Sequence, residues 1–97
     1  MSTDRWTYTI LGQAKKALAK GLIQGRARNA LDLFLVELSC LGPYRSNWPN
    51  YTKMNDEEYH CHLKKGRPTY VVCWRIISKI EKTIEVYYAG THEKAPY

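Results

Sequence analysis

The chain has 97 residues, a length that fits one domain with a single modest hydrophobic core. Hydrophobic residues make up 44% and charged residues 25% of it, as in ordinary soluble globular proteins, and no apolar run approaches the roughly 20 residues that span a bilayer. The net charge of +6 favours a polyanionic partner such as RNA or DNA, or an acidic protein, without choosing among them. The polar start of the chain is unlike a secretory signal peptide, so we expect a cytoplasmic protein with no membrane contact.

The N-terminal half predicts one strand and two helices. Residues 5–11 alternate around aromatic and β-branched side chains, which indicates a strand. Residues 13–20 are rich in Ala and Lys and predict a short exposed helix, and the Gly-Pro pair at 42–43 ends a second, longer helix. The apolar residues of that second helix recur at helical spacing, namely Ile23, Ala27, Ala30, Leu31, Phe34, Leu38 and Leu41.

The C-terminal half predicts a long polar loop over 44–58 and then three strands over 58–65, 69–77 and 83–90. Short turns join these strands, so we expect an antiparallel meander. The apolar stripe of the helix must be buried against one face of that sheet. The predicted fold is therefore α+β, a single domain over 1–97 in the order β-α-α-β-β-β, with both helices on one face of an antiparallel sheet.

Three cysteines, Cys40, Cys61 and Cys73, are an odd number and lack the CxxC spacing of redox or zinc motifs. They favour reduced thiols over a disulfide framework, as is usual in a reducing compartment. Cys40 and Cys61 occupy apolar positions, and we expect both in the core.

The stretch "EYHCHLKKGR" at 58–67 holds two of the three histidines and a cysteine. Because side chains alternate along a strand, its two sets of residues point to opposite faces of the sheet. The inward set over the three strands is Tyr59, Cys61, Leu63, Tyr70, Val72, Trp74, Ile76, Ile84, Val86 and Tyr88. The outward set is His60, His62, Lys64, Val71, Cys73, Arg75, Glu85 and Tyr87.

The outward face combines imidazoles, cations and aromatic rings, and His92 and Tyr97 follow the last strand and can fold over its end. Cations pair with phosphates and aromatic rings stack on bases, so this face suits an RNA backbone. A solvated polar face is the plain alternative. Three histidines on one face could also bind Zn²⁺, but Cys61 points to the other face and the sequence lacks a further ligand at zinc-site spacing.

Two stretches, "YHCHLKKGRPTYVVCWRI" and "TIEVYYAGTHEKAPY", resemble the RelE/ParE superfamily of toxins from toxin–antitoxin pairs, with "YTKM" at 51–54 matching a Lys-Leu element of that family. The resemblance covers roughly residues 5–97 and implies the fold order given above. His60 and His62 match strand positions where RelE-type members carry basic residues. His92 matches an Arg or His after the last strand, and Tyr97 lies close to the family's C-terminal Tyr. Val71 departs from the family, which often has a phosphate-binding arginine there.

The resemblance implies a metal-independent endoribonuclease, an mRNA interferase without a cofactor. In its reaction the 2′-hydroxyl attacks the adjacent phosphate while one group removes a proton and another donates one. We expect His92 to be one proton-transfer group and His60 or His62 the other, with Tyr97 orienting or stacking on a base. The candidate RNA-binding residues are Lys53, Lys64, Lys65, Arg67, Arg75 and Tyr87, of which Arg67 or Arg75 would replace the arginine missing at Val71.

The same resemblance implies a cognate antitoxin as partner, with mRNA and the ribosome as substrate and site of action, and DNA contact only through an antitoxin complex. Two alternatives stay open on the sequence: a non-catalytic ParE-type toxin that binds DNA gyrase, and an inactive family member that only binds. Ribosome dependence, codon preference and the division of acid and base roles do not follow from the sequence.

Overall fold

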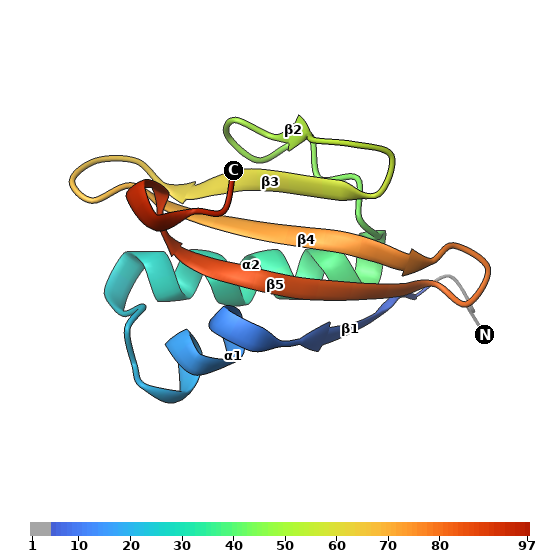
Figure 1. Ribbon diagram of the computed structural model, residues 1–97, viewed down its shortest axis with the longest axis horizontal. Coiled ribbons are helices and arrows are strands. Elements are labelled where there is room, and N and C mark those ends of the chain that lie inside the picture. Colours follow the sequence, from blue (N-terminus) through green and yellow to red (C-terminus); the bar gives the residue numbers. More distant parts are fainter. Residues whose placement is uncertain (1–4) are drawn as a thin grey trace.

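The computed structural model describes residues 5–97 and shows an α+β fold with two helices and one open, mixed five-stranded sheet (Figure 1). The helices are α1 (Gly12–Ala19) and α2 (Gly25–Leu41). The strands are β1 (Thr7–Ile10), β2 (Thr52–Lys53), β3 (Glu58–Lys64), β4 (Tyr70–Ser78) and β5 (Thr83–Thr91), and a 3-10 helix η1 (His92–Lys94) follows the last strand. None of the helices within residues 5–97 has the length and apolarity needed to cross a bilayer.

The sheet order is β1-β5-β4-β3-β2, and β3, β4 and β5 form the predicted antiparallel meander. The prediction of a fully antiparallel sheet is wrong at one edge, because β1 pairs with β5 in parallel. Short turns fix the direction only of strands that follow one another, and both helices lie between β1 and β5 in the chain. The loop predicted over 44–58 also contains the two-residue strand β2, which pairs with β3 at the opposite edge.

One hydrophobic core contains side chains of both helices and of the sheet. Ala14 and Ala17 of α1 and the stripe of α2 meet the inward side chains of β3, β4 and β5 there. Trp74 lies at its centre, with its ring 4.8 Å from that of Phe34, and its indole N–H donates a hydrogen bond to the carbonyl of Pro43 at 3.0 Å. The inward positions Tyr59, Cys61 and Leu63 are buried as the alternation predicted.

Three details of the predicted core are wrong. Cys40 is exposed, because it lies two residues and therefore about 200° around the helix from the buried Leu38. Leu41 is also exposed, at the end of α2 where the chain turns at Gly42. Tyr88 belongs to the opposite face, because a bulge pairs Cys73 with Tyr88 but Trp74 with Val86 and so interrupts the alternation of β5.

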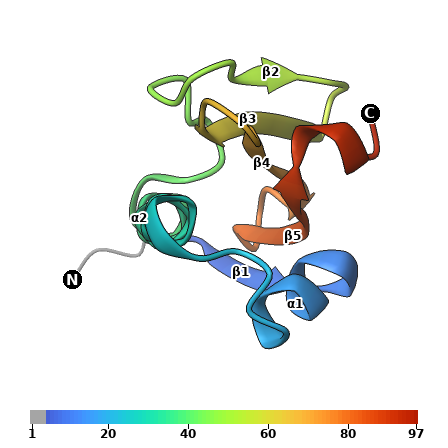
Figure 2. The same cartoon turned by 90° about the vertical axis from the view of Figure 1, so that its left-hand side faces the viewer.

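The face away from the helices is partly covered by the chain's own C-terminal segment, residues 92–97, which returns across the sheet from the end of β5 (Figures 1 and 2). Val71, Cys73 and Tyr88 form a second small buried cluster on this side, with Ala95 packed against it. The alternation placed Val71 and Cys73 on this face correctly, but both are fully buried. The C-terminal segment therefore buries the middle of this face around Val71 and Cys73.

Candidate functional site

The C-terminal segment brings together the four residues that the sequence nominated for catalysis. The rings of His60 and Tyr97 are stacked, with centroids 3.9 Å apart and planes at 14°. The rings of His62 and His92 meet edge to face at 5.6 Å, and the His92 and Tyr97 rings at 5.8 Å. Strand β3 therefore supplies half of one compact cluster, and the end of the chain supplies the other half.

His60 and His62 occupy different environments within that cluster. His60 is only 8% exposed, and its Nδ1 is buried without a hydrogen-bond partner among the described residues. Burial, together with the charges of His62 and His92, lowers the pKa of His60. His62 is partly exposed, and burial, His92 and Lys65 lower its pKa as well. Of the two, His62 is the one that solvent and a substrate can reach.

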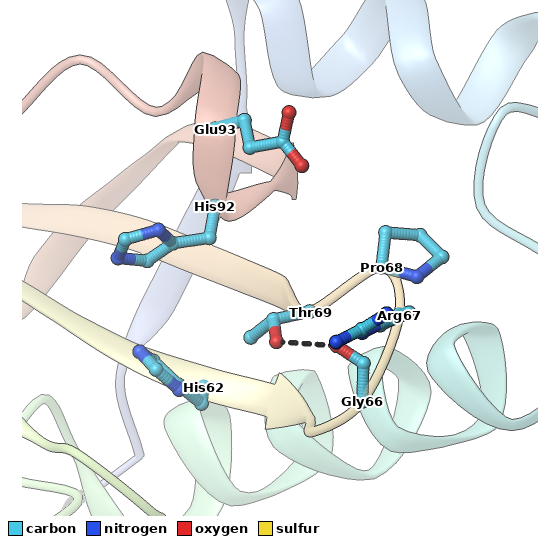
Figure 3. A pocket seen from close by; sticks show the side chains of 7 residues that line it. All are labelled: His62, Gly66, Arg67, Pro68, Thr69, His92 and Glu93. Atoms are coloured by element: carbon cyan, nitrogen blue, oxygen red, sulfur yellow. Dashed lines mark hydrogen bonds between the residues drawn. The ribbon is translucent and has the colours of Figure 1, made fainter.

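His62 and His92 line one side of a cleft of about 510 Å³, and the loop between β3 and β4 lines the other (Figure 3). The backbone holds these parts in place, since the amide of His62 donates to the carbonyl of Pro49 and the amide of His92 donates to that of Thr69, both at 2.8 Å. The hydroxyl of Thr69 donates to the carbonyl of Gly66, also at 2.8 Å. The residues lining the cleft are His62, Gly66, Arg67, Pro68, Thr69, His92 and Glu93.

Arg67 is the predicted RNA-binding cation that faces the histidine pair across this cleft (Figure 3). Its guanidinium is exposed and makes no ion pair with any residue in 5–97, so its donors are available to an anion. Lys65 lies in the same loop, close enough for its charge to affect the pKa of His62. The cleft thus offers two imidazoles and two nearby cations, the groups that suit a phosphodiester.

Two predicted cations lie elsewhere. A bulge between His62 and Lys64 interrupts the alternation of β3 and pairs Lys64 with Tyr70. Lys53 pairs with Tyr59 and so lies on the helix side of the sheet. Neither lysine lines the cleft.

We call the sheet face that carries His60 and His62 the histidine face. Arg75 and Tyr87 also lie on it, at the end away from the cleft. Arg75 forms ion pairs with Glu58 at 3.6 Å and with Glu85 at 3.3 Å, and its guanidinium lies 4.1 Å from the centre of the Tyr87 ring. The Tyr87 hydroxyl in turn donates to Glu58 at 3.2 Å, and burial raises the pKa of Tyr87. Two carboxylates neutralise this cation, so the group forms a structural cluster and offers little positive charge to a phosphate.

Val71, the position where the resemblance expects an arginine, lies under the C-terminal segment. It is fully buried against Cys73 and Tyr88. A charged side chain there would lie in an apolar cluster, so this position does not suit the arginine that the resemblance expects. Arg67 is the candidate replacement that reaches the cleft, while Arg75 is held by its own carboxylates.

Glu93 is the cleft residue that sequence reasoning missed. It follows His92 directly on η1, and the two side chains leave that turn in opposite directions (Figure 3). A carboxylate repels phosphate but accepts hydrogen bonds from hydroxyl and amino groups. Its position directly after His92 could have identified it as a candidate. A single charged residue near the C-terminus, however, is common in protein sequences.

The described residues form no metal-binding cluster, and two of the three thiols are buried. Within residues 5–97 no group of three or more His, Cys, Asp or Glu side chains is arranged to hold a metal ion. Cys61 and Cys73 are buried, and burial raises the pKa of Cys61 and raises that of Cys73 to about 12, so both are neutral thiols near neutral pH. Burial also raises the pKa of Tyr97 to about 12, which leaves its hydroxyl protonated.

Comparison with known proteins adds no assignment. No family model, no curated protein and no solved structure matches this chain.

Proposed function

We propose that this chain is the toxin component of a toxin–antitoxin pair, an endoribonuclease of the RelE type that cleaves mRNA and so inhibits translation. The observation that carries the proposal is the cleft in which His62 and His92 lie opposite Arg67. The α+β fold with two helices and a five-stranded sheet is compatible with that family. The proposal includes a cytoplasmic location, a cognate antitoxin as partner, and mRNA on the ribosome as substrate.

The histidine pair supports cleavage through the 2′-hydroxyl. One imidazole takes the 2′ proton, the 2′ oxygen attacks phosphorus, the bond to the 5′ oxygen breaks, and the second imidazole protonates that leaving oxygen. The products are a 2′,3′-cyclic phosphate and a 5′-hydroxyl. The lowered pKa of His62 keeps it neutral near pH 7, which suits the base, and His92 is then the acid.

The remaining residues hold the RNA in this scheme. The guanidinium of Arg67 pairs with the phosphate and stabilises the charge that builds up in the transition state. Tyr97 stacks on His60 and is 49% exposed, and its exposed part stacks on a base. His60, buried and stacked, positions Tyr97 and does not itself transfer a proton.

The test is incubation of the purified protein with single-stranded RNA and with mRNA on ribosomes, followed by analysis of the fragment ends. The proposal expects 2′,3′-cyclic phosphate and 5′-hydroxyl ends, and expects a single 2′-deoxy nucleotide at the cleavage site to abolish cleavage. The absence of cleavage with both substrates, from protein shown to be folded, would contradict it. Inhibition of gyrase supercoiling in a parallel assay would then favour the gyrase-binding toxin.

A further inference from the structure

The outer side of α2 carries a regular pattern that the core does not use. Leu33 and Val36 are 54% and 59% exposed, and Cys40 follows them on the same side. Toward the N-terminus of α2, further exposed residues follow at alternating spacings of four and three residues. The members of this pattern, which we call the outer stripe, are Arg26, Asn29, Leu33, Val36 and Cys40.

The spacing of the outer stripe is that of the a and d positions of a coiled coil, with a at 26, 33 and 40 and d at 29 and 36. At 100° per residue, this stripe lies opposite the buried side chains of α2, which include Leu31, Phe34 and Leu38. Figure 2 shows α2 at the edge of the molecule with no other element within residues 5–97 on its outer side. Leu33 and Val36 are therefore exposed, with no element within residues 5–97 packed on their side of α2.

The charges of α2 run against its own dipole. Its first turn has no acidic residue and carries Arg26, and its last turn has no basic residue. A helix prefers the reverse, because its N-terminus is partially positive and its C-terminus partially negative. Arg28 forms an ion pair with Asp32, whereas Arg26 makes no ion pair with any residue in 5–97. An antiparallel neighbour with the same charges would compensate both ends at once.

We propose that the outer stripe binds the outer stripe of a second copy of this chain, antiparallel, in a two-fold symmetric dimer. In an antiparallel pair, each a position of one helix packs against a d position of the other. Leu33 then lies against Val36 of the other copy, and Asn29 lies against its Cys40. Arg26 lies beside the last turn of the other α2, where the free carbonyls accumulate negative charge. This interface lies on the helix side of the molecule, so it does not depend on the cleft or on the proposed ribonuclease function.

The first test measures molecular mass by sedimentation equilibrium across a hundredfold range of protein concentration. The wild-type chain is expected to approach twice the monomer mass, with less dimer in high salt because Arg26 contributes. Leu33→Glu and Val36→Glu place like charges in the central layers and should leave a monomer. Ile80→Glu is the matched control, since Ile80 is 95% exposed in another part of the chain. A wild-type chain that stays monomeric, or a control that dissociates as the stripe variants do, would overturn the proposal.

The second test fixes the direction of the two helices. In the antiparallel register the two Cys40 residues lie roughly 16 Å apart along the axis, too far for a disulfide, since eleven residues rise 1.5 Å each. Asn29→Cys should instead form an interchain disulfide with Cys40 of the other copy under mild oxidant, and the same variant with Cys40→Ser should not. A Cys40–Cys40 dimer in the wild-type chain would contradict the antiparallel arrangement, as would an Asn29→Cys chain that does not crosslink.

Discussion

The histidine face has an arginine at each end, and the two arginines differ in whether carboxylates surround them. At one end, Arg67 is exposed across a cleft from His62 and His92 and has no carboxylate partner within residues 5–97. At the other, Arg75 is bracketed by Glu58 and Glu85. A sequence shows two arginines on comparable surfaces, but only the first keeps its charge available to an anion. Whether an arginine keeps its charge available to an anion therefore depends on the acidic residues that the sheet register brings beside it.

The largest effect is expected from removal of the histidines that line the cleft. His62→Gln and His92→Gln should each lower the RNA cleavage rate by about 10²–10⁴-fold, because each removes one proton-transfer group. The rate should be measured under single-turnover conditions, with near-UV circular dichroism to verify the fold. His60→Gln is the contrasting variant, and an equal loss in all three would contradict the assignment of roles.

Introducing the family's arginine at Val71 should damage the fold without creating a phosphate site. Val71→Arg buries a charge among Cys73 and Tyr88, which should cost about 3–5 kcal/mol of unfolding free energy. Urea denaturation measures the loss, and Val71→Ile serves as the apolar control with a smaller effect. A Val71→Arg protein as stable as wild type would show that the C-terminal segment does not seal this position.

The two arginines provide the direct contrast. Arg67→Ala should weaken transition-state binding by about 1.5–3 kcal/mol, or roughly 10–160-fold in kcat/KM, as expected for a charge-assisted hydrogen bond. Arg75→Ala should leave cleavage within about twofold. Measuring RNA cleavage by both variants at one ionic strength shows which end of the histidine face binds the phosphate. A larger loss in Arg75→Ala than in Arg67→Ala would assign the phosphate site to the Arg75 end.

The smallest expected effect is a pH dependence of stability. The folded-state pKa values of His60 and His62 are lowered, so the unfolded chain binds more protons below the ordinary histidine pKa of about 6.5. Stability should therefore be complete above that pH and decline as the pH falls from there toward the lowered values. Denaturation between pH 7.5 and 5 measures this decline, and His60→Phe should reduce it. An unchanged slope in that variant would show that His60 is not desolvated.

Local sequence patterns correctly predicted much of the fold. The stripe of α2 and the inward positions Tyr59, Cys61 and Leu63 follow from helical and strand periodicity and from the need to bury one face. The parallel pairing of β1 with β5 did not follow, because it depends on where a distant segment docks. The two bulges did not follow either, and the one in β5 moved Tyr88 to the face opposite that predicted.

The candidate site was predictable in its residues but not in its environment. Alternation and the closing motif nominated His60, His62, His92 and Tyr97, which the structure brings together. The burial of His60 and Val71 depends on the path of residues 92–97 over the sheet, which no local pattern encodes. The pairing of Arg75 with two carboxylates depends in the same way on cross-strand register.

The most direct test of the central claim is to locate RNA on the protein. A short 2′-deoxy oligonucleotide, which binds but cannot be cleaved through a 2′-hydroxyl, would be titrated into labelled protein while amide and imidazole resonances are followed by NMR. We predict shifts at His62, His92 and the 66–69 loop, with Arg75, Glu85 and Tyr87 unmoved. Shifts centred on Arg75 and Tyr87, or none at saturating oligonucleotide, would contradict the assignment of the cleft as the RNA site.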